Sequence, residues 1–189
     1  MINIGSWNVR GVGDPVKKAA VFTTLEWYGV EVICIQETHL TKETKLRLVN
    51  KRKYQSQYHS VYTSYSRGVS IVVKTGVSFV CMEERIDELG RYIFLHCLIE
   101  NVPYVLANIY IPPPFKMEVL YKLMEFAVNK VNIPVLVVGD LNNVLNRTMD
   151  RFPPGTQRKR LGGGTFGGRN IQICGSIPVF QVHIPHCQE

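Results

Sequence analysis

The sequence lacks the features that place a chain in a membrane, in the secretory pathway or among zinc-binding proteins. No run of eighteen apolar residues occurs, and residues 1–11 show no basic segment followed by an apolar one. The five cysteines are scattered, with no CxxC and no paired Cys/His spacing, which predicts reduced thiols that fill the core. We therefore expect an intracellular location and no membrane partner, and a nuclear location stays open.

Acidic residues are nearly absent from the C-terminal part of the chain. Glu189 is the only acid in residues 151–189, which are rich in Gly and Pro and show no helical period. We predict one domain over residues 1–150 and a basic tail over 151–189 that is loop or disordered, with at most one short strand at 177–184. The run GGGTFGG lacks the Lys-Ser/Thr of a phosphate-binding loop, and RKR at 158–160 is more typical of a solvated charge cluster than of a nuclear signal.

The sequence does contain enough apolar residues for one core, together with an excess of positive charge. Its 189 residues are 46% hydrophobic, which suits a single globular domain. The net charge of +7 favours a polyanionic partner, because neutralising phosphates releases counterions. An excess of positive charge alone is weak evidence for DNA as the partner.

The apolar patterns predict an α/β or α+β class, with helices covering a mixed sheet. A strand at 2–8 leads to a helix that Asp14 caps, Pro15 begins and Gly29 ends, and a strand buried on both faces follows at 30–36. Further strands are predicted at 68–74, 77–83, 91–100 and 103–111, as an antiparallel meander, and at 135–140. In the predicted helix 115–131, the apolar positions 117, 120, 121, 124, 127, 128 and 131 fall on one side, which we predict to be buried.

Polar side chains stand at the ends of four of these strands, at Asn8, Glu37, Tyr110 and the pair Asp140 and Asn142. In layered sheet proteins such strand ends can converge in one cleft. Glu37 suits a Mg²⁺ ligand, and Asp140 suits a group that orients or deprotonates an attacking water. Asn8, Asn142 and Tyr110 are donors for phosphate oxygens. The set is therefore typical of metal-assisted phosphoryl chemistry.

Each of these residues also has a purely structural interpretation. Glu37 alone is typical of a solvated loop, and Asp140 with Asn142 of a turn that satisfies backbone donors. Asn8 is compatible with a cap and Tyr110 with a core position. Their joint occurrence is what favours a site.

Six motifs then give the chain a resemblance to a known family. They are WN at 7–8, CIQETHL at 34–40, SRGVSIVV at 66–73, GRYIFLHC at 90–97, ANIYIPP at 107–113 and VVGDLN at 137–142. In order and spacing they resemble the endonuclease/exonuclease/phosphatase superfamily, and most closely the endonuclease domain of LINE-type retrotransposons. The resemblance implies an α/β sandwich of two sheets, here with an incomplete second sheet. It also implies DNA nicking with Mg²⁺, or alternatively Mn²⁺, and no small-molecule cofactor.

The resemblance also implies a role for each candidate residue. Glu37 corresponds to the metal ligand of the family, Asn8 to the asparagine of its first strand and Tyr110 to its phosphate-facing tyrosine. Asp140 and Asn142 correspond to the acid and the amide that handle the attacking water and the transition state. Apurinic-site repair enzymes match less well, because they carry an acid where this chain has Arg10.

The sequence departs from the family pattern after residue 150. The family completes its site with a later aspartate and a Ser-Asp-His stretch, but no aspartate follows Asp150 here. The late histidines, His183 and His186, do not follow an acid that would orient the imidazole. We therefore expect weak or absent activity from a C-terminally truncated domain. A non-catalytic DNA-binding relic, a phosphatase and a fragment without a stable fold remain alternatives, and the oligomeric state stays open.

Overall fold

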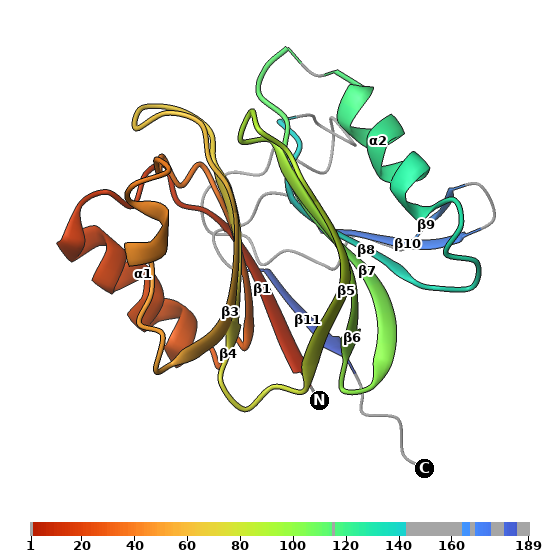
Figure 1. The fold of residues 1–189 in the computed structure, drawn as a ribbon, viewed down its shortest axis with the longest axis horizontal. Coiled ribbons are helices and arrows are strands. Elements are labelled where there is room, and N and C mark those ends of the chain that lie inside the picture. Colours follow the sequence, from red (N-terminus) through yellow and green to blue (C-terminus); the bar gives the residue numbers. More distant parts are fainter. Residues whose placement is uncertain (1, 115, 143–163, 167–168, 175–179, 185–189) are drawn as a thin grey trace, which may run out of the picture.

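Two β-sheets pack face to face in the computed structural model, which describes residues 2–114, 116–142, 164–166, 169–174 and 180–184 (Figure 1). The first sheet has the strand order β11 (Phe180–Ile184), β1 (Ile2–Asn8), β2 (Val32–Gln36), β4 (Val69–Lys74) and β3 (Tyr54–Ser60). The second has the order β5 (Phe79–Ile86), β6 (Tyr92–Ile99), β7 (Val102–Tyr110), β8 (Val135–Asp140), β10 (Arg169–Cys174) and β9 (Gly164–Phe166). The predicted two-sheet α/β sandwich is confirmed.

One helix covers the outer face of each sheet (Figure 1). Helix α1 (Pro15–Trp27) begins at Asp14, whose carboxylate accepts a 2.7 Å hydrogen bond from the Lys17 backbone N–H, as the cap prediction requires. Helix α2 (Glu118–Ala127) packs on β6 and β7. A 3₁₀ turn, η1 (Lys45–Arg47), lies between β2 and β3. No helix of the described residues is long and apolar enough to cross a bilayer.

Strand direction decides where the polar strand ends meet. Strands β1 and β2 pair in parallel, and so do β7 and β8 in the other sheet. All four therefore end on the same side of the sandwich, which is the upper end in Figure 1. Between the sheets lies an apolar core formed by residues such as Ile4, Ile71, Leu95, Leu106 and Val138. This core holds the two sets of strand ends in a fixed relation to each other.

One sequence-based expectation about the strands is wrong, and one strand was not predicted. Strand β4 belongs to the first sheet and β5 to the second, so only β5, β6 and β7 form the antiparallel meander. Residues 75–78 connect β4 in the first sheet to β5 in the second. The turn residues Thr75 and Gly76 do not show in the sequence whether the next strand stays in the same sheet. The polar segment YQSQYHS forms β3, which the pattern at 40–68 did not predict, because its backbone pairs with β4 despite its polar side chains.

The predicted buried side of the second helix is also largely wrong. Val119, Leu123 and Phe126 are buried, whereas the side chains at 117, 121, 124, 128 and 131 are exposed. Helix α2 therefore has apolar side chains on two sides, and the pattern selected mostly the solvent side. Among the described residues, Cys34, Cys81 and Cys97 form no disulfide.

In the C-terminal part, β11 lies within the single strand predicted at 177–184, while β9 and β10 were not expected. The proposed domain boundary near residue 150, the RKR cluster and His186 lie outside the described residues.

Candidate active site

The amide of Asn8 joins two carboxylates that come from different sheets. Its Nδ2 donates one hydrogen bond to Glu37 Oε1 and one to Asp140 Oδ2, both 2.8 Å long. Asn8 ends β1 and Glu37 follows β2 in the first sheet, whereas Asp140 ends β8 in the second. The structure thus brings together three of the predicted residues. Because both amide hydrogens are used, Asn8 positions the carboxylates and is not a donor for phosphate.

Tyr110 ends β7, and its hydroxyl forms hydrogen bonds with the side chains of Glu37 and Asn142. The side chain is 8% exposed. Burial raises the pKa of Tyr110 to about 12, and the negative charge of Glu37 adds to the effect. The phenol therefore stays protonated at neutral pH and can donate a hydrogen bond.

Asp140 and Asn142 form a local turn at the end of β8. The backbone N–H of Asn142 donates to Asp140 Oδ1 at 3.0 Å, and its side-chain Nδ2 donates to the Ile111 carbonyl at 2.9 Å. The Tyr110 hydroxyl contacts the same Asn142 side chain, so a substrate oxygen would have to replace that contact to accept from the amide. Gly139, before Asp140, has φ of 139°, and a Cβ there would overlap the Ile109 carbonyl oxygen. Only glycine lets β8 deliver Asp140 so close to β7.

Four non-glycine residues in the loops of this site have left-handed backbone conformations. Their φ angles are 47° at Arg10, 51° at Glu37, 54° at His39 and 47° at Asn142. Such conformations cost free energy and cluster at functional sites, where the surrounding structure enforces them. Nothing in the sequence signals them, because none of the four is glycine.

Backbone hydrogen bonds hold the Glu37 loop on both sides. The carbonyl of Glu37 accepts from the Gly11 N–H at 2.6 Å, and the Thr38 N–H donates to the Gly68 carbonyl at 3.0 Å. A Cβ on Gly68 would meet the buried Thr38 hydroxyl. The loop that carries Glu37 is therefore fixed before any ligand binds.

His39 is a site residue that the candidate set omitted. Its Nε2 lies 3.8 Å from Glu37 Oε2, and both side chains are 21% exposed. The sequence could have indicated His39, because it stands two residues after Glu37 in the polar segment that follows β2. It places a second polar group beside the carboxylate oxygen that does not bond to Asn8.

Below the site, a neutral hydrogen-bond network also joins the two sheets. Gln36 Nε2 donates to Asn108 Oδ1 at 2.7 Å and to Ser6 Oγ at 3.0 Å. Asn108 Nδ2 donates to the carbonyls of Ser70, at 2.9 Å, and Ile35, at 3.2 Å. These side chains are at most 5% exposed. The network supports the layer above it, and Asn108 takes no part in the site itself.

The donor set suits a hard divalent cation. Among the described residues no three His, Cys, Asp or Glu side chains gather as a metal cage. Magnesium usually takes only one or two carboxylates, with water and substrate phosphate completing its shell. Glu37 supplies one carboxylate oxygen that Asn8 does not occupy, and Asp140 lies on the other side of the same amide.

Of the two late histidines, His183 lies within the described residues, and it is not brought to this site. His183 lies in β11 and pairs with Asn3, five residues along β1 from Asn8. Five strand residues span about 17 Å. The backbone of His183 is therefore remote from the polar strand ends.

Comparison with known proteins places the fold. The chain is similar to the catalytic domain of Xenopus laevis APE2, with 22% identity and a TM-score of 0.57, over 82% of this chain and 62% of that one. It is also similar to an AP endonuclease from Archaeoglobus fulgidus, with 21% identity and a TM-score of 0.56, over 79% and 60%. A mannosyl-6-phosphatase from Bacteroides thetaiotaomicron gives 13% identity and a TM-score of 0.58, over 79% and 69%.

The chain thus spans about three fifths of the APE2 catalytic domain and of the Archaeoglobus AP endonuclease. At these identities the likeness concerns the fold alone, and it includes nucleases and a phosphatase. A sequence model of one family matches residues 5–172, which include every residue of the site described above. The chain belongs to the endonuclease/exonuclease/phosphatase family.

Proposed function

We propose that this chain binds DNA and hydrolyses one of its phosphodiester bonds with the help of Mg²⁺ or Mn²⁺, in the manner of a LINE-type retrotransposon endonuclease. One observation carries the proposal, namely the single Asn8 amide that holds Glu37 and Asp140 together across the two sheets. Two carboxylates around one amide leave negative charge at the surface, which a divalent cation and its waters neutralise. The family resemblance of the six motifs supplies the choice of DNA.

The residues then divide the work of an in-line hydrolysis. When bound at Glu37, a divalent cation stabilises negative charge on the phosphate oxygens. Asp140, fixed by Asn8 and by the Asn142 N–H, orients an attacking water and accepts its proton. A phosphate oxygen that replaces the contacts of Tyr110 with Asn142 and Glu37 accepts from the Asn142 amide and from the protonated Tyr110 hydroxyl.

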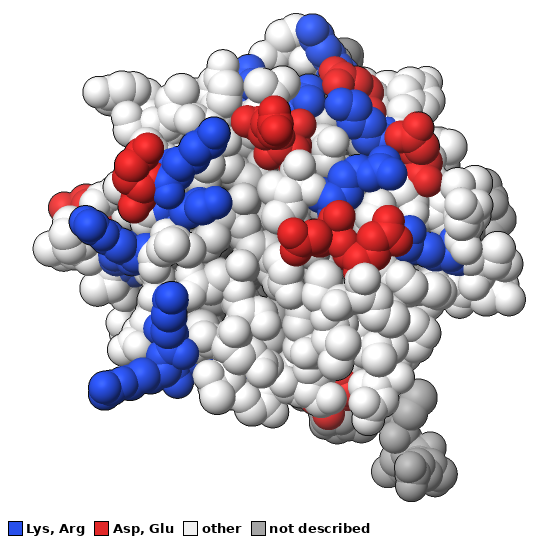
Figure 2. All heavy atoms as spheres, viewed as in Figure 1, with Lys and Arg blue, Asp and Glu red and all other residues white. Residues whose placement is uncertain are grey.

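Charge on the surface supports a polyanionic substrate. Figure 2 shows Lys and Arg side chains interspersed with acidic ones over the upper part of one face, further basic side chains at its lower left, and a largely uncharged lower centre. The upper half is also where the strands of the site end (Figure 1). The net charge of +7 attracts a phosphate backbone, and its effect weakens as salt rises.

The expected rate is low. The sequence supplies no aspartate after Asp150, and the family pattern places an acid and a Ser-Asp-His stretch there. Catalytic groups of one site act together, so a missing histidine lowers the rate by orders of magnitude. The proposal is therefore a slow, metal-dependent nicking activity.

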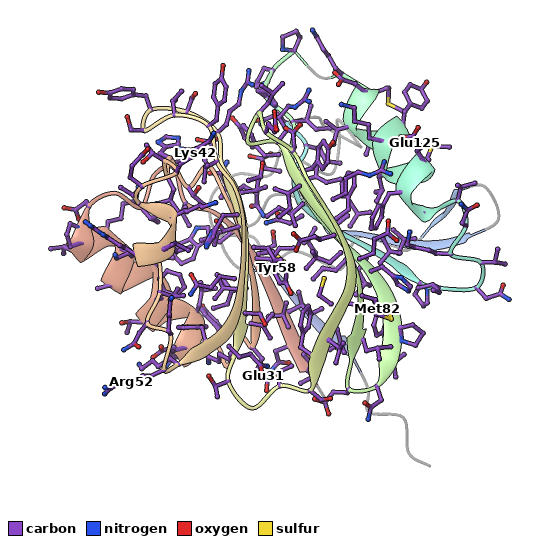
Figure 3. All side chains as sticks on the ribbon, in the orientation of Figure 1. Glu31, Lys42, Arg52, Tyr58, Met82 and Glu125 are labelled. Atoms are coloured by element: carbon purple, nitrogen blue, oxygen red, sulfur yellow. The ribbon has the colours of Figure 1, made fainter. Side chains whose placement is uncertain are left out.

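Nicking of supercoiled plasmid tests the proposal. We expect slow conversion to open circles in Mg²⁺ or Mn²⁺, none in EDTA, and at least about a tenfold loss in Glu37→Gln and Asp140→Asn. Glu125→Gln is the matched control, because Glu125 is exposed on α2, away from the polar strand ends (Figure 3). Equal nicking by Glu37→Gln and the unchanged chain would contradict the proposal. Release of phosphate from a small monoester without nicking of DNA would assign the site to a phosphatase.

A further inference from the structure

The loop between β3 and β4, residues 61–68, presents aromatic side chains beside the candidate active site. It projects past the upper end of the strands (Figure 1). Tyr65 is 88% exposed and Tyr62 is 45% exposed. An exposed tyrosine offers a flat apolar ring and a polar hydroxyl to a ligand. The hydrolysis proposed above assigns no role to either ring.

A closed turn fixes the shape of this loop. Thr63 and Ser66 pair as an isolated antiparallel bridge, and their hydroxyls lie 3.1 Å apart. The Tyr65 backbone N–H donates to the Thr63 hydroxyl at 3.4 Å. The loop therefore holds Tyr65 at its tip without burying it, which lowers the entropy cost of binding a flat ligand.

Arg67 completes the surface with a positive charge. Its guanidinium carbon lies 4.7 Å above the centre of the Tyr62 ring, a cation–π distance, and its Nη1 donates to the Leu89 carbonyl at 3.4 Å. A Cβ at Gly90 would lie 2.9 Å from Tyr62 Cβ and 3.2 Å from Arg67 Cβ. The β5–β6 turn thus packs closely against the loop.

Two hydrogen bonds join the loop to the segment that carries Glu37. The His39 N–H donates to the Arg67 carbonyl, and the Thr38 N–H donates to the Gly68 carbonyl, both at 3.0 Å. A nucleic acid with its phosphate at Glu37 therefore has a neighbouring nucleotide next to this loop. Aromatic rings and guanidinium planes bind unpaired bases by stacking, and a paired base offers no free face.

We infer that Tyr62, Tyr65 and Arg67 form a stacking surface for an unpaired nucleobase next to the scissile phosphate. The inference rests on the proposed function and narrows its substrate to nucleic acid with a single-stranded or frayed nucleotide at the site. It also separates such substrates from small phosphate esters, which have no base to stack. Sequence-tolerant binding follows, because every base has a π face.

Oligonucleotide binding in EDTA tests the inference without any catalysis. Fluorescence anisotropy compares a single-stranded 12-mer, the same strand with abasic sites, and its duplex, and a 2-aminopurine base reports stacking through quenching. We expect the single strand to bind most tightly. Tyr65→Ala and Tyr62→Ala should each bind it about 5- to 100-fold more weakly, the range of one lost base–aromatic stack. Tyr65→Phe should keep affinity within about twofold, because the ring remains.

Tyr121→Ala is the control, because Tyr121 is a 61% exposed tyrosine on α2. Equal binding of the abasic and normal strands, or unchanged binding and quenching in Tyr65→Ala, would overturn the inference. If binding depends on the bases but plasmid is not nicked, the stacking surface is supported and the proposed hydrolysis is contradicted. If plasmid is nicked but binding does not depend on the bases, the proposed hydrolysis is supported and the stacking surface is contradicted.

Discussion

Two polar bridges connect the sheets near their upper ends, and they differ in charge. The inner bridge consists of Gln36 and Asn108, and the outer bridge of Asn8, Glu37 and Asp140. In the inner bridge each amide hydrogen bond ends on a neutral oxygen, and both amides are almost fully buried. In the outer bridge one amide serves two carboxylates, of which Glu37 is partly exposed and Asp140 is 9% exposed. A neutral bridge stabilises a fold, whereas an anionic one is suited to a cation.

Breaking the inner bridge should have the largest effect on stability. Asn108→Leu removes the acceptor of Gln36 and leaves the carbonyls of Ser70 and Ile35 without this donor. Each unsatisfied buried group costs about 1–3 kcal/mol, so we expect a loss of about 3–5 kcal/mol in the free energy of unfolding. Urea denaturation measures it. Asn129→Leu, at an exposed position, is the control, and a loss below about 1 kcal/mol in Asn108→Leu would contradict the comparison.

Acid should weaken the inner bridge next. His59 is buried and its Nδ1 lies 2.8 Å from the hydroxyl of Ser70, whose carbonyl accepts from Asn108. Burial lowers the pKa of His59 from 6.5 to about 4, so the unfolded chain takes up the proton first as pH falls. Stability should therefore be full above pH 6.5 and fall by up to about 3 kcal/mol between pH 6.5 and 4. His59→Gln should flatten this slope, and an unchanged slope in that variant would assign acid sensitivity to other groups.

Breaking the outer bridge should affect activity more than stability. Asn8→Ala removes the donor that Glu37 and Asp140 share, while the neutral layer below stays intact. Loss of a residue that orients metal ligands usually costs 10- to 100-fold, so we expect nicking to fall by about that factor. Unfolding free energy should change by about 1 kcal/mol. The control is Asn3→Ala at the opposite end of β1, and a large stability loss with unchanged nicking would assign Asn8 to the fold.

The smallest effect is expected at Tyr110. Tyr110→Phe keeps the ring and removes only the hydroxyl that contacts Glu37 and Asn142, which should cost about 1 kcal/mol of stability at pH 7. Because the folded pKa is raised to about 12 from 10, stability should fall as pH rises from 10 to 12 in the unchanged chain. Thermal melts across this range would show a shallower fall in Tyr110→Phe.

The sequence predicted the outer bridge better than the inner one. Polar residues after apolar strands identified Glu37 and Asp140, because parallel strands end on one side of a sheet. Gln36 and Asn108 stand 72 residues apart, and neither carries a pattern that tells whether its amide points into the core or into solvent. The motifs predicted the sandwich class. They did not predict that β4 and β5 belong to different sheets, because the short connection between these strands resembles a hairpin turn in the sequence.

Helix α2 shows a second limit of sequence patterns. Its apolar side chains lie on two sides, and periodicity cannot say which side meets the sheet. The left-handed backbone at Glu37 and His39 was equally hidden, since only packing against residues 67–68 and Gly11 enforces it. Long-range contacts therefore decided what local patterns left open.

Titration with Mn²⁺, followed by the electron paramagnetic resonance signal of the free ion, tests most directly whether the outer bridge is a cation site. We predict one bound ion per chain, an affinity at least about tenfold lower in Glu37→Gln, and unchanged binding in Glu125→Gln. Equal Mn²⁺ binding by Glu37→Gln and the unchanged chain, or no binding by either, would contradict the account.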